Sequence, residues 1–378
     1  MAKRPIFEEV SEPQAAKPKA SVPKGIEAPQ GARLAIQAWL WLLFAMVVAM
    51  IALGGLTRLT DSGLSITEWR PLAGALPPLN AADWAAEFAR YQQIDQYRLV
   101  NEGMSLSEFQ FIYWWEWSHR QLGRLMGAVW AVGFLWFWLR KQIPAGWTAR
   151  LLIPGVLGGL QGAIGWWMVH SGLQTGMVAV ASYRLAVHLG LAFVILGVLA
   201  SYAFLLGRSS SNLLQARRAR EAKLFSLSTG LMHFAFLQII LGALVAGIDA
   251  GRGYTDWPMM GGGFLPPAMF ELQPLWRNLF ENDGTVQFIH RMSGYLLAVF
   301  GVIVWMRGRR SAFSQTRRAF HWVMTALAGQ IVLGIVTVLQ GAPVSLGISH
   351  QILAVILWVL ILRARHLSQY PLGGTIRG

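Results

Sequence analysis

Long apolar stretches recur along the chain and alternate with polar segments. Eight of them carry few charges, and at about 1.5 Å of rise per residue each is long enough, or nearly so, to cross a bilayer as a helix. The hydropathy pattern therefore predicts an all-α polytopic membrane protein with eight transmembrane helices. The predicted spans are residues 35–57, 118–139, 150–169, 184–206, 226–248, 288–306, 319–340 and 346–363.

Composition agrees with this pattern and removes several kinds of chemistry. Hydrophobic residues make up 54% of the 378 positions and charged residues only 13%, which is too apolar for a soluble protein of this length. The chain contains no cysteine. Disulfides, thiolate metal sites, iron–sulfur clusters and covalently attached haem are therefore excluded.

The distribution of positive charge predicts the orientation in the membrane. The net charge is +14, and 22 of the 32 lysine and arginine residues lie in the two tails and in alternate connections between the apolar stretches. The positive-inside rule places these segments, and both termini, in the cytoplasm. The basic excess is then a topology signal, so no nucleic-acid partner is expected. The basic connections contain Arg140, Lys141 and Arg150; Arg208, Arg217, Arg218, Arg220 and Lys223; and Arg307, Arg309, Arg310, Arg317 and Arg318.

The remaining segments differ in character. Residues 1–33 are rich in Pro, Ala and Lys without apolar periodicity, which predicts a disordered cytoplasmic tail rather than a cleavable signal peptide. This tail lacks the look of a mitochondrial transit peptide, which favours a bacterial inner membrane. Two external connections, 58–117 and 249–287, are long enough to suggest a role such as covering a site.

The two halves of the chain resemble each other. His119-Arg120-Gln121-Leu122-Gly123 and His290-Arg291-Met292-Ser293-Gly294 open corresponding apolar stretches. Further along, Gln161, Gly165 and His188 correspond to Gln330, Gly334 and His350. A parallel repeat of this kind predicts two pseudo-symmetric four-helix bundles. The predicted organisation is a tail (1–33), an N-terminal bundle (34–207), a cytoplasmic linker (208–224), a C-terminal bundle (225–366) and a C-terminal tail (367–378).

Four histidines begin four of the apolar stretches at the same predicted depth. A porphyrin between helices needs two imidazoles at matching heights, and His119 with His188, and His290 with His350, meet that requirement. Gly123 and Gly294 follow two of these histidines by one helical turn and would let a flat macrocycle approach the backbone. The alternatives are helix-bridging histidines and pairing of His119 with a second-half histidine. We interpret His170, His233 and His321 as packing or interfacial residues and His366 as part of the tail.

One carboxylate distinguishes the two predicted sites. Glu116 precedes His119 by three positions, whereas the equivalent position before His290 is Gln287. A carboxylate beside a haem could accept a proton or stabilise a developing cation. A structural alternative is that Glu116 pairs with Arg120, four residues on.

Arginines near the outer boundary are candidates for contacts with haem propionates. Arg120, Arg124 and Arg291 fit this role because guanidinium groups pair well with carboxylates, although ordinary interfacial snorkelling would also place them there. Arg58, Asp61 and Glu68 follow the first span and predict either a structured turn beside the first site or a helix cap.

The pattern resembles the haem A synthase family over essentially residues 35–365. The resemblance rests on Gly54-Gly55-Leu56-Thr57-Arg58-Leu59-Thr60 with Ser62-Gly63-Leu64-Ser65, on Glu116-Trp117-Ser118-His119-Arg120, and on His188, His290-Arg291 and His350. It is closer to the mitochondrial and α-proteobacterial type than to the type with a cysteine pair in its first external loop.

The resemblance implies an oxidoreductase that converts the C8 methyl of haem O to a formyl group, giving haem A for terminal oxidases. It implies that His119 and His188 bind the substrate haem O, that Glu116 is catalytic, and that His290 and His350 are axial ligands of a haem b cofactor that relays electrons. Haem O synthase and oxidase assembly factors are the protein partners that it suggests. A homo-oligomer is left open.

Two other functions use the same residues. A dihaem b-type cytochrome for quinol-linked electron transfer would need the same four histidines, although such proteins usually stack haems at two depths. A transporter of haem or small molecules built on a parallel repeat is the third alternative. The lack of charged residues in the inner halves of the helices disfavours it.

Overall fold

The computed structural model describes residues 30–71 and 73–373, and within them every regular element is a helix. Eight helices are long and apolar enough to cross a membrane, so the predicted number of spans is confirmed. Most of the predicted tail 1–33, and residues 374–378, lie outside the described residues. The spanning helices are α1 (Gln30–Leu59), α4 (Leu106–Leu139), α5 (Thr148–Gly172), α6 (Ser182–Leu206), α8 (Ala222–Gly247), α10 (Asp283–Gly308), α11 (Ser314–Leu339) and α12 (Val344–Gln369).

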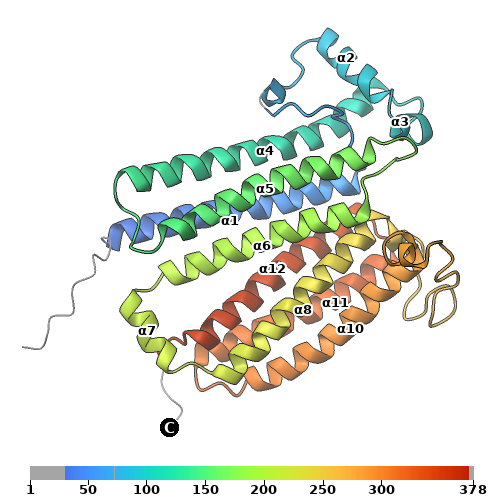
Figure 1. Ribbon diagram of the computed structural model, residues 1–378. Coiled ribbons are helices and arrows are strands. Elements are labelled where there is room, and N and C mark those ends of the chain that lie inside the picture. The colour runs from blue at the N-terminus through green and yellow to red at the C-terminus, as the bar shows by residue number, and fades with distance from the viewer. Residues whose placement is uncertain (1–29, 72, 374–378) are drawn as a thin grey trace, which may run out of the picture.

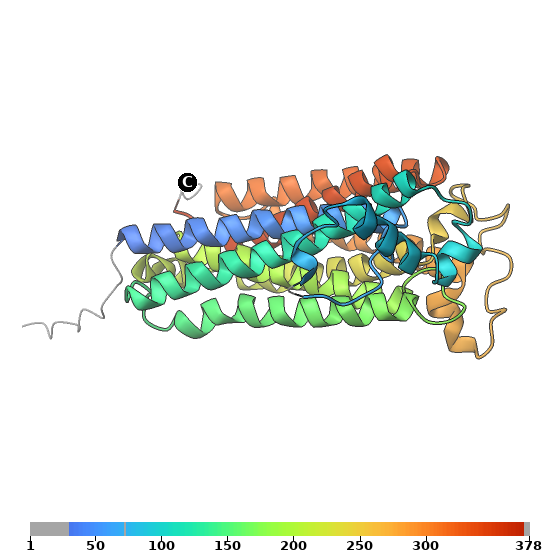
Figure 2. The same ribbon diagram turned by 90° about the horizontal axis from the view of Figure 1, so that it is seen from above.

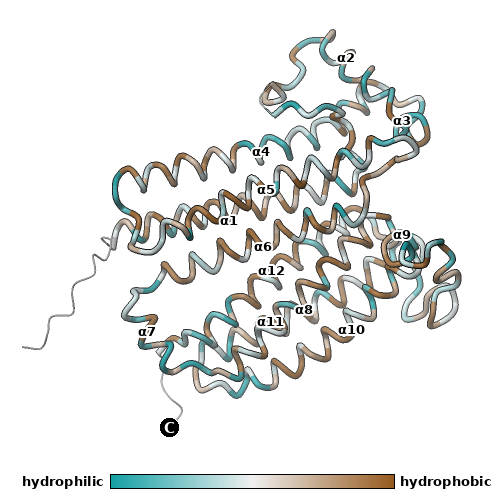
Figure 3. The backbone as a smooth tube through the Cα atoms, in the orientation of Figure 1, coloured by the Kyte–Doolittle hydropathy of each residue, from teal (hydrophilic) through white to brown (hydrophobic). Residues whose placement is uncertain are grey.

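The spanning helices lie side by side, and the short elements gather at their ends (Figures 1 and 2). We call the end that carries the two long connections the loop end. There lie η1 (Ala73–Ala75), α2 (Ala81–Tyr91), α3 (Asp95–Leu99), η2 (Ala250–Arg252), η3 (Leu275–Arg277) and α9 (Asn278–Glu281). The opposite end carries the described ends of the chain and α7 (Ser210–Arg218). Apolar residues dominate the spanning helices and polar ones the connections (Figure 3).

Helix contacts follow the internal repeat. In the first half α1 packs against α4 and α6, and α5 packs against both α4 and α6. In the second half α8 packs against α10 and α12, and α11 packs against both α10 and α12. The predicted division into two four-helix bundles stays a prediction, because contacts between the halves, above all those of α6 with α8, are as extensive as those between neighbouring helices within them. The halves meet where α6 contacts α8 and α12 and where α1 contacts α12.

The core lies along this central seam. Phe193 and Leu196 of α6 are almost fully buried there, and the indole nitrogen of Trp358 on α12 donates to the carbonyl oxygen of Phe193 at 3.1 Å. The side chain of Gln351 likewise donates to the carbonyl oxygen of Ile51 on α1 at 2.7 Å. Buried apolar contacts, together with polar contacts such as these, therefore join the halves into one body.

Several boundaries differ from those expected. Helix α4 begins at Leu106 rather than near 118, because Ser105 and Glu108 form a reciprocal capping box. Its extra turns are held by an apolar cluster in which Phe109 and Tyr113 pack beside Tyr91 of α2. The predicted linker 208–224 contains a helix, α7, with its own cap at Ser209.

At the other end of the chain, α12 continues to Gln369 instead of ending near 363. The interpretation of His366 as a tail residue is therefore wrong. Its side chain is 8% exposed and lies beside the rings of Phe204 and Tyr370. Leu367 and Ser368 are also buried, so the first residues assigned to the tail 367–378 belong to the helix.

Candidate functional site

Each of the four key histidines packs its ring against a glycine of the preceding spanning helix. A Cβ atom added at Gly54 of α1 would lie 2.9 Å from Cε1 of His119, and one at Gly165 of α5 would lie 2.9 Å from Cε1 of His188. The second half repeats this geometry. A Cβ atom added at Gly242 of α8 would lie 3.0 Å from Cε1 of His290, and one added at Gly334 of α11 would lie 3.0 Å from Cε1 of His350. The fold therefore contains four equivalent helix pairs, each supplying one imidazole near the loop end. The glycines of the helix pairs are needed because a methyl group would collide with the ring.

The glycines singled out from the sequence do something different. A Cβ atom at Gly123 would lie 3.5 Å from the terminal methyl of Met50, and one at Gly294 would lie 3.3 Å from the side-chain nitrogen of Gln238. These glycines therefore accommodate a side chain of the neighbouring helix. The role suggested for them in admitting a macrocycle stays a prediction.

A glutamine fixes three of the four helix pairs at the histidine itself. The side-chain nitrogens of Gln161, Gln238 and Gln330 donate to the backbone carbonyl oxygens of His188, His290 and His350 at 2.9, 2.9 and 3.0 Å. Each glutamine stands four residues before the glycine that faces the ring. Gln238 was not singled out from the sequence, although the spacing Gln-x-x-x-Gly shared with the other two would have revealed it.

The fourth helix pair departs from this rule. The position four residues before Gly54 is Met50, so no amide reaches His119 from α1. The Nδ1 atom of His119 is buried and has no hydrogen-bond partner among the described residues. The surroundings of His119 are consequently more apolar than those of the other three histidines.

All four histidines line one cavity of about 760 Å³ that extends into both halves. Pairing of the histidines within each half stays a prediction.

The residues fit a haem in each half. Two imidazoles from different helices are what bis-histidine ligation requires, and each half supplies such a pair along the cavity. Among the described residues, no three His, Asp or Glu side chains gather to bind a bare metal ion.

Glu116 borders the cavity and is held on all sides. Its carboxylate accepts hydrogen bonds from the hydroxyl of Ser65 at 2.7 Å and the backbone N–H of Ile66 at 2.8 Å. Its other oxygen pairs with Arg120 at 2.6 Å, and the residue is only 3% exposed. The pairing with Arg120 considered from the sequence is thus present within α4. The bonds from Ser65 and Ile66 join Glu116 to the connection that follows α1.

Gln287 occupies the equivalent place with the opposite hydrogen-bonding sense. Its side-chain nitrogen donates to the carbonyl oxygen of Tyr254 at 3.1 Å, and its oxygen accepts from Arg291 at 3.2 Å. In the first half the connection supplies donors, so an acceptor-only carboxylate fits. In the second half it supplies an acceptor, so an amide fits. The Glu/Gln difference therefore matches the two connections as well as the proposed chemistry.

The three arginines considered for haem propionates line the cavity and already have partners. Arg120 donates to the carbonyl oxygen of Ile66 at 2.9 Å, Arg124 to that of Pro71 at 2.9 Å, and Arg291 to that of Asp256 at 2.9 Å. Each ties a loop-end connection to the helix on which the arginine lies. Contacts to propionates stay a prediction.

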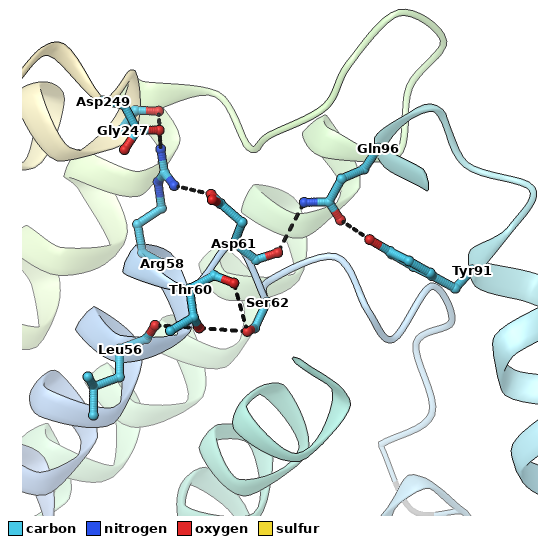
Figure 4. Close-up of polar contacts among 9 residues, drawn as sticks. All are labelled: Leu56, Arg58, Thr60, Asp61, Ser62, Tyr91, Gln96, Gly247 and Asp249. Atoms are coloured by element: carbon cyan, nitrogen blue, oxygen red, sulfur yellow. Dashed lines mark hydrogen bonds and ion pairs between the residues drawn. The ribbon is translucent and has the colours of Figure 1, made fainter. Parts of the chain in front are cut away.

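Arg58 joins the two halves at the loop end (Figure 4). Its guanidinium contacts Asp61 at 2.7 Å and Asp249 at 2.6 Å, and its side chain is only 11% exposed. The two aspartates are equivalent, since each follows a histidine-facing glycine by seven residues and each has a left-handed backbone, with φ of 52° and 53°. One arginine therefore binds a pseudo-symmetric pair of carboxylates. The sequence suggested a structured turn here but gave no sign of Asp249.

The connections themselves are stabilised by polar contacts outside the membrane-spanning helices. The carboxylate of Asp256 accepts hydrogen bonds from the backbone N–H groups of Gly261 and Gly262 at 3.0 and 3.1 Å, and these bonds lower its pKa. In the first connection, burial raises the pKa of Tyr91, whose hydroxyl bonds to Gln96 and Asn101. Both connections are thus ordered structures over the cavity.

The other histidines have local partners. The Nδ1 atom of His233 lies 2.9 Å from the carbonyl oxygen of Thr229, and His321 accepts a hydrogen bond from the indole of Trp305 at 3.1 Å. His170 stacks on Trp166 and also lines the cavity. These contacts support the interpretation of all three as packing or interfacial residues.

Known proteins resemble this chain over nearly its whole length. The profile of a family described as cytochrome oxidase assembly protein matches residues 37–362. A protein named heme A synthase from Ruegeria sp. (strain TM1040) is 64% identical over 381 residues, covering 100% of both chains. Proteins of the same name are 60% identical in Paracoccus denitrificans (strain Pd 1222), covering 100% of this chain and 99% of theirs, and 59% identical in Cereibacter sphaeroides (strain ATCC 17029 / ATH 2.4.9), covering 99% and 98%.

Proposed function

Because the chain belongs to the haem A synthase family, we propose that it oxidises the C8 methyl group of haem O to the formyl group of haem A. The observation that carries this proposal is the pair of bis-histidine sites that differ only in their surroundings. The first half has Glu116 and an apolar wall at Met50, whereas the second half has Gln287 and a glutamine at every histidine. One site is then suited to chemistry and the other to a permanent cofactor.

In this proposal the first half binds the substrate. His119 of α4 and His188 of α6 would ligate the haem O iron. The second half, through His290 and His350, would hold haem b, which supplies electron relay. Gln238 and Gln330 orient the two cofactor ligands by fixing the backbone at each histidine.

The contacts of Glu116 favour one of its two candidate roles. Three donors already hold the carboxylate, so a mobile proton carrier would have to break existing bonds. A fixed negative charge beside the first site instead suits electrostatic stabilisation of positive charge that develops at the C8 methyl during its oxidation. We therefore assign Glu116 to charge stabilisation.

The setting follows from the charge distribution. The ends of the spanning helices opposite the loop end carry the basic connections, which supports a cytoplasmic location for that end. The protein is then a multi-pass protein of the bacterial inner membrane, with both haem sites near its extracytoplasmic face. Haem O is an apolar and reactive molecule, so direct transfer from haem O synthase, and of product to oxidase assembly factors, is the expected route.

Haem extraction tests the proposal. The protein is purified in detergent from cells that make haem O, and its haems are identified by chromatography and mass. Haem b together with haem O or haem A is expected. A His350→Ala variant should lose haem b but keep haem O at the first site. Two equivalents of haem b alone would refute the proposal and favour the dihaem cytochrome.

A further inference from the structure

The two halves differ in how the seam between their second and third spanning helices is filled. Gln161 and Gln330 fix the register, because both bond to a histidine carbonyl. In that register Gly158 and Gly162 of α5 correspond to Leu327 and Ile331 of α11. The first half therefore has no side chains at the two positions where the second half has large apolar ones.

The space left by these glycines is open. A Cβ atom at Gly158 or Gly162 would meet nothing within 4 Å, and both residues line the cavity. In the second half, by contrast, Leu327 is 3% exposed and packs over Gly301 of α10, while Ile331 packs against the main core. A slot thus exists between α4 and α5, whereas the side chains of Leu327 and Ile331, which also line the cavity, occupy the equivalent positions between α10 and α11.

The slot has defined ends and apolar walls. Its outer end is at Gly165, against which the ring of His188 lies, and its inner end is at Gly155, which is covered by the ring of Trp130. These glycines are ten residues apart, or roughly 15 Å at the helical rise. Gly123 and Met126 of α4 and Met50 of α1 line the same cavity.

The slot belongs to the cavity that holds the histidines. Gly158, Gly162 and His119 all line this cavity, and the ring of His188 lies against Gly165 at the outer end of the slot. Gly162 is exposed and lines the cavity. An apolar chain attached to a group bound at His119 could therefore extend along the slot.

We propose that the slot between α4 and α5 binds the long isoprenoid chain of haem O. This inference rests on the proposed function. Haem O carries that chain where haem b has a vinyl group, and burying it along apolar walls is favourable. Leu327 and Ile331 occupy the equivalent positions of the second half with large side chains, which matches a cofactor without the chain. Gly158 and Gly162 are then the residues that distinguish substrate from cofactor.

Binding titrations test this inference without measuring turnover. The purified protein, with haem b in its second site, is titrated in detergent with haem O and separately with haem B, and the Soret change reports ligation at the first site. Gly158→Leu and Gly162→Ile copy the residues of the second half. Gly159→Leu is the matched control, because its position is also open but does not line the cavity.

We expect the wild type and Gly159→Leu to bind haem O at least about tenfold more tightly than haem B, since several methylene groups are buried. Gly158→Leu and Gly162→Ile should bind both haems with the affinity that the wild type has for haem B. If these variants kept the wild-type preference for haem O over haem B, the proposal that the slot binds the isoprenoid chain would be refuted. Failure of the wild type to bind either haem at the first site would instead refute the proposed function.

Discussion

Replacing Glu116 by glutamine separates the structural and chemical contributions of this residue. The side chain keeps its shape, but one of its two terminal atoms changes from an acceptor to a donor. Ser65, Ile66 and Arg120 all donate to the carboxylate, so no orientation of the amide satisfies every one of them. The connection after α1 should therefore loosen even when the protein has no substrate.

The magnitude follows from the contacts. A buried donor left without an acceptor costs about 1–3 kcal/mol, and breaking a buried ion pair costs about 3–5 kcal/mol. Arg120 keeps the carbonyl oxygens of Ile66 and Glu68, which offsets part of the loss. We expect the local stability to fall by about 2–4 kcal/mol, which corresponds to amide exchange at Ile66 that is about 30-fold to about 900-fold faster.

Hydrogen exchange measured by mass spectrometry checks this expectation. Glu108→Gln is the control, because Glu108 is an exposed carboxylate of the same helix in a capping box that glutamine can also form. Unchanged exchange at Ile66 in Glu116→Gln, together with lost haem A formation, would refute the anchoring role and leave only the chemical one.

Three further predictions concern other contacts. Gly334→Ala should displace the ring of His350 and reduce the haem b content per protein in a pyridine haemochrome assay. Gly329→Ala is the control and should keep its haem, because its Cβ atom would make an ordinary contact 3.6 Å from Leu353. Equal haem contents in the two variants would contradict the packing argument. A double-mutant cycle of Arg58→Ala and Asp249→Ala, read by thermal unfolding, should give a coupling free energy of about 1 kcal/mol or more, because Arg58 is buried, and additive effects would exclude a working ion pair. The pKa of Asp256 is lowered in the folded protein, so the hydrogen bonds that its carboxylate accepts stabilise the connection fully above the unfolded pKa of about 3.9. This stabilisation is lost as the pH falls through the folded pKa. Asp256→Asn should therefore abolish the acid-induced increase in amide exchange at Gly261 and Gly262 that the wild type shows below about pH 4.

Hydropathy and a repeated motif were sufficient to predict the eight spans and the common depth of four histidines. Both properties depend on residues near in sequence, since helix length and the His-Arg spacing are local. The early start of α4 was also readable from the capping box at Ser105 and Glu108. It was missed because Glu108 and Glu116 interrupt the apolar residues of these turns, which resemble the helix-like segments of the preceding connection.

The remaining features depend on contacts between distant segments. Nothing local to Gly242 shows that it faces His290, because that contact requires the register of α8 against α10. Two partners of Glu116 come from a connection about 50 residues earlier in the chain, where the N–H of Ile66 donates to the carboxylate. At the equivalent position, Gln287 instead donates to the carbonyl oxygen of Tyr254. Such complementarity between segments becomes visible only when both are placed in space.

The ion pair between Arg58 and Asp249 sets an order for the biogenesis of the protein. The two residues are 191 positions apart, so at typical synthesis rates Arg58 leaves the ribosome roughly 10 to 40 s before its partner. During that interval the nascent first half can use only Asp61, and the surface of α6 that will meet α8 is still uncovered. A chaperone or insertase that shields this surface would have to release it when α8 arrives, and the closing of Arg58 onto Asp249 would mark that moment.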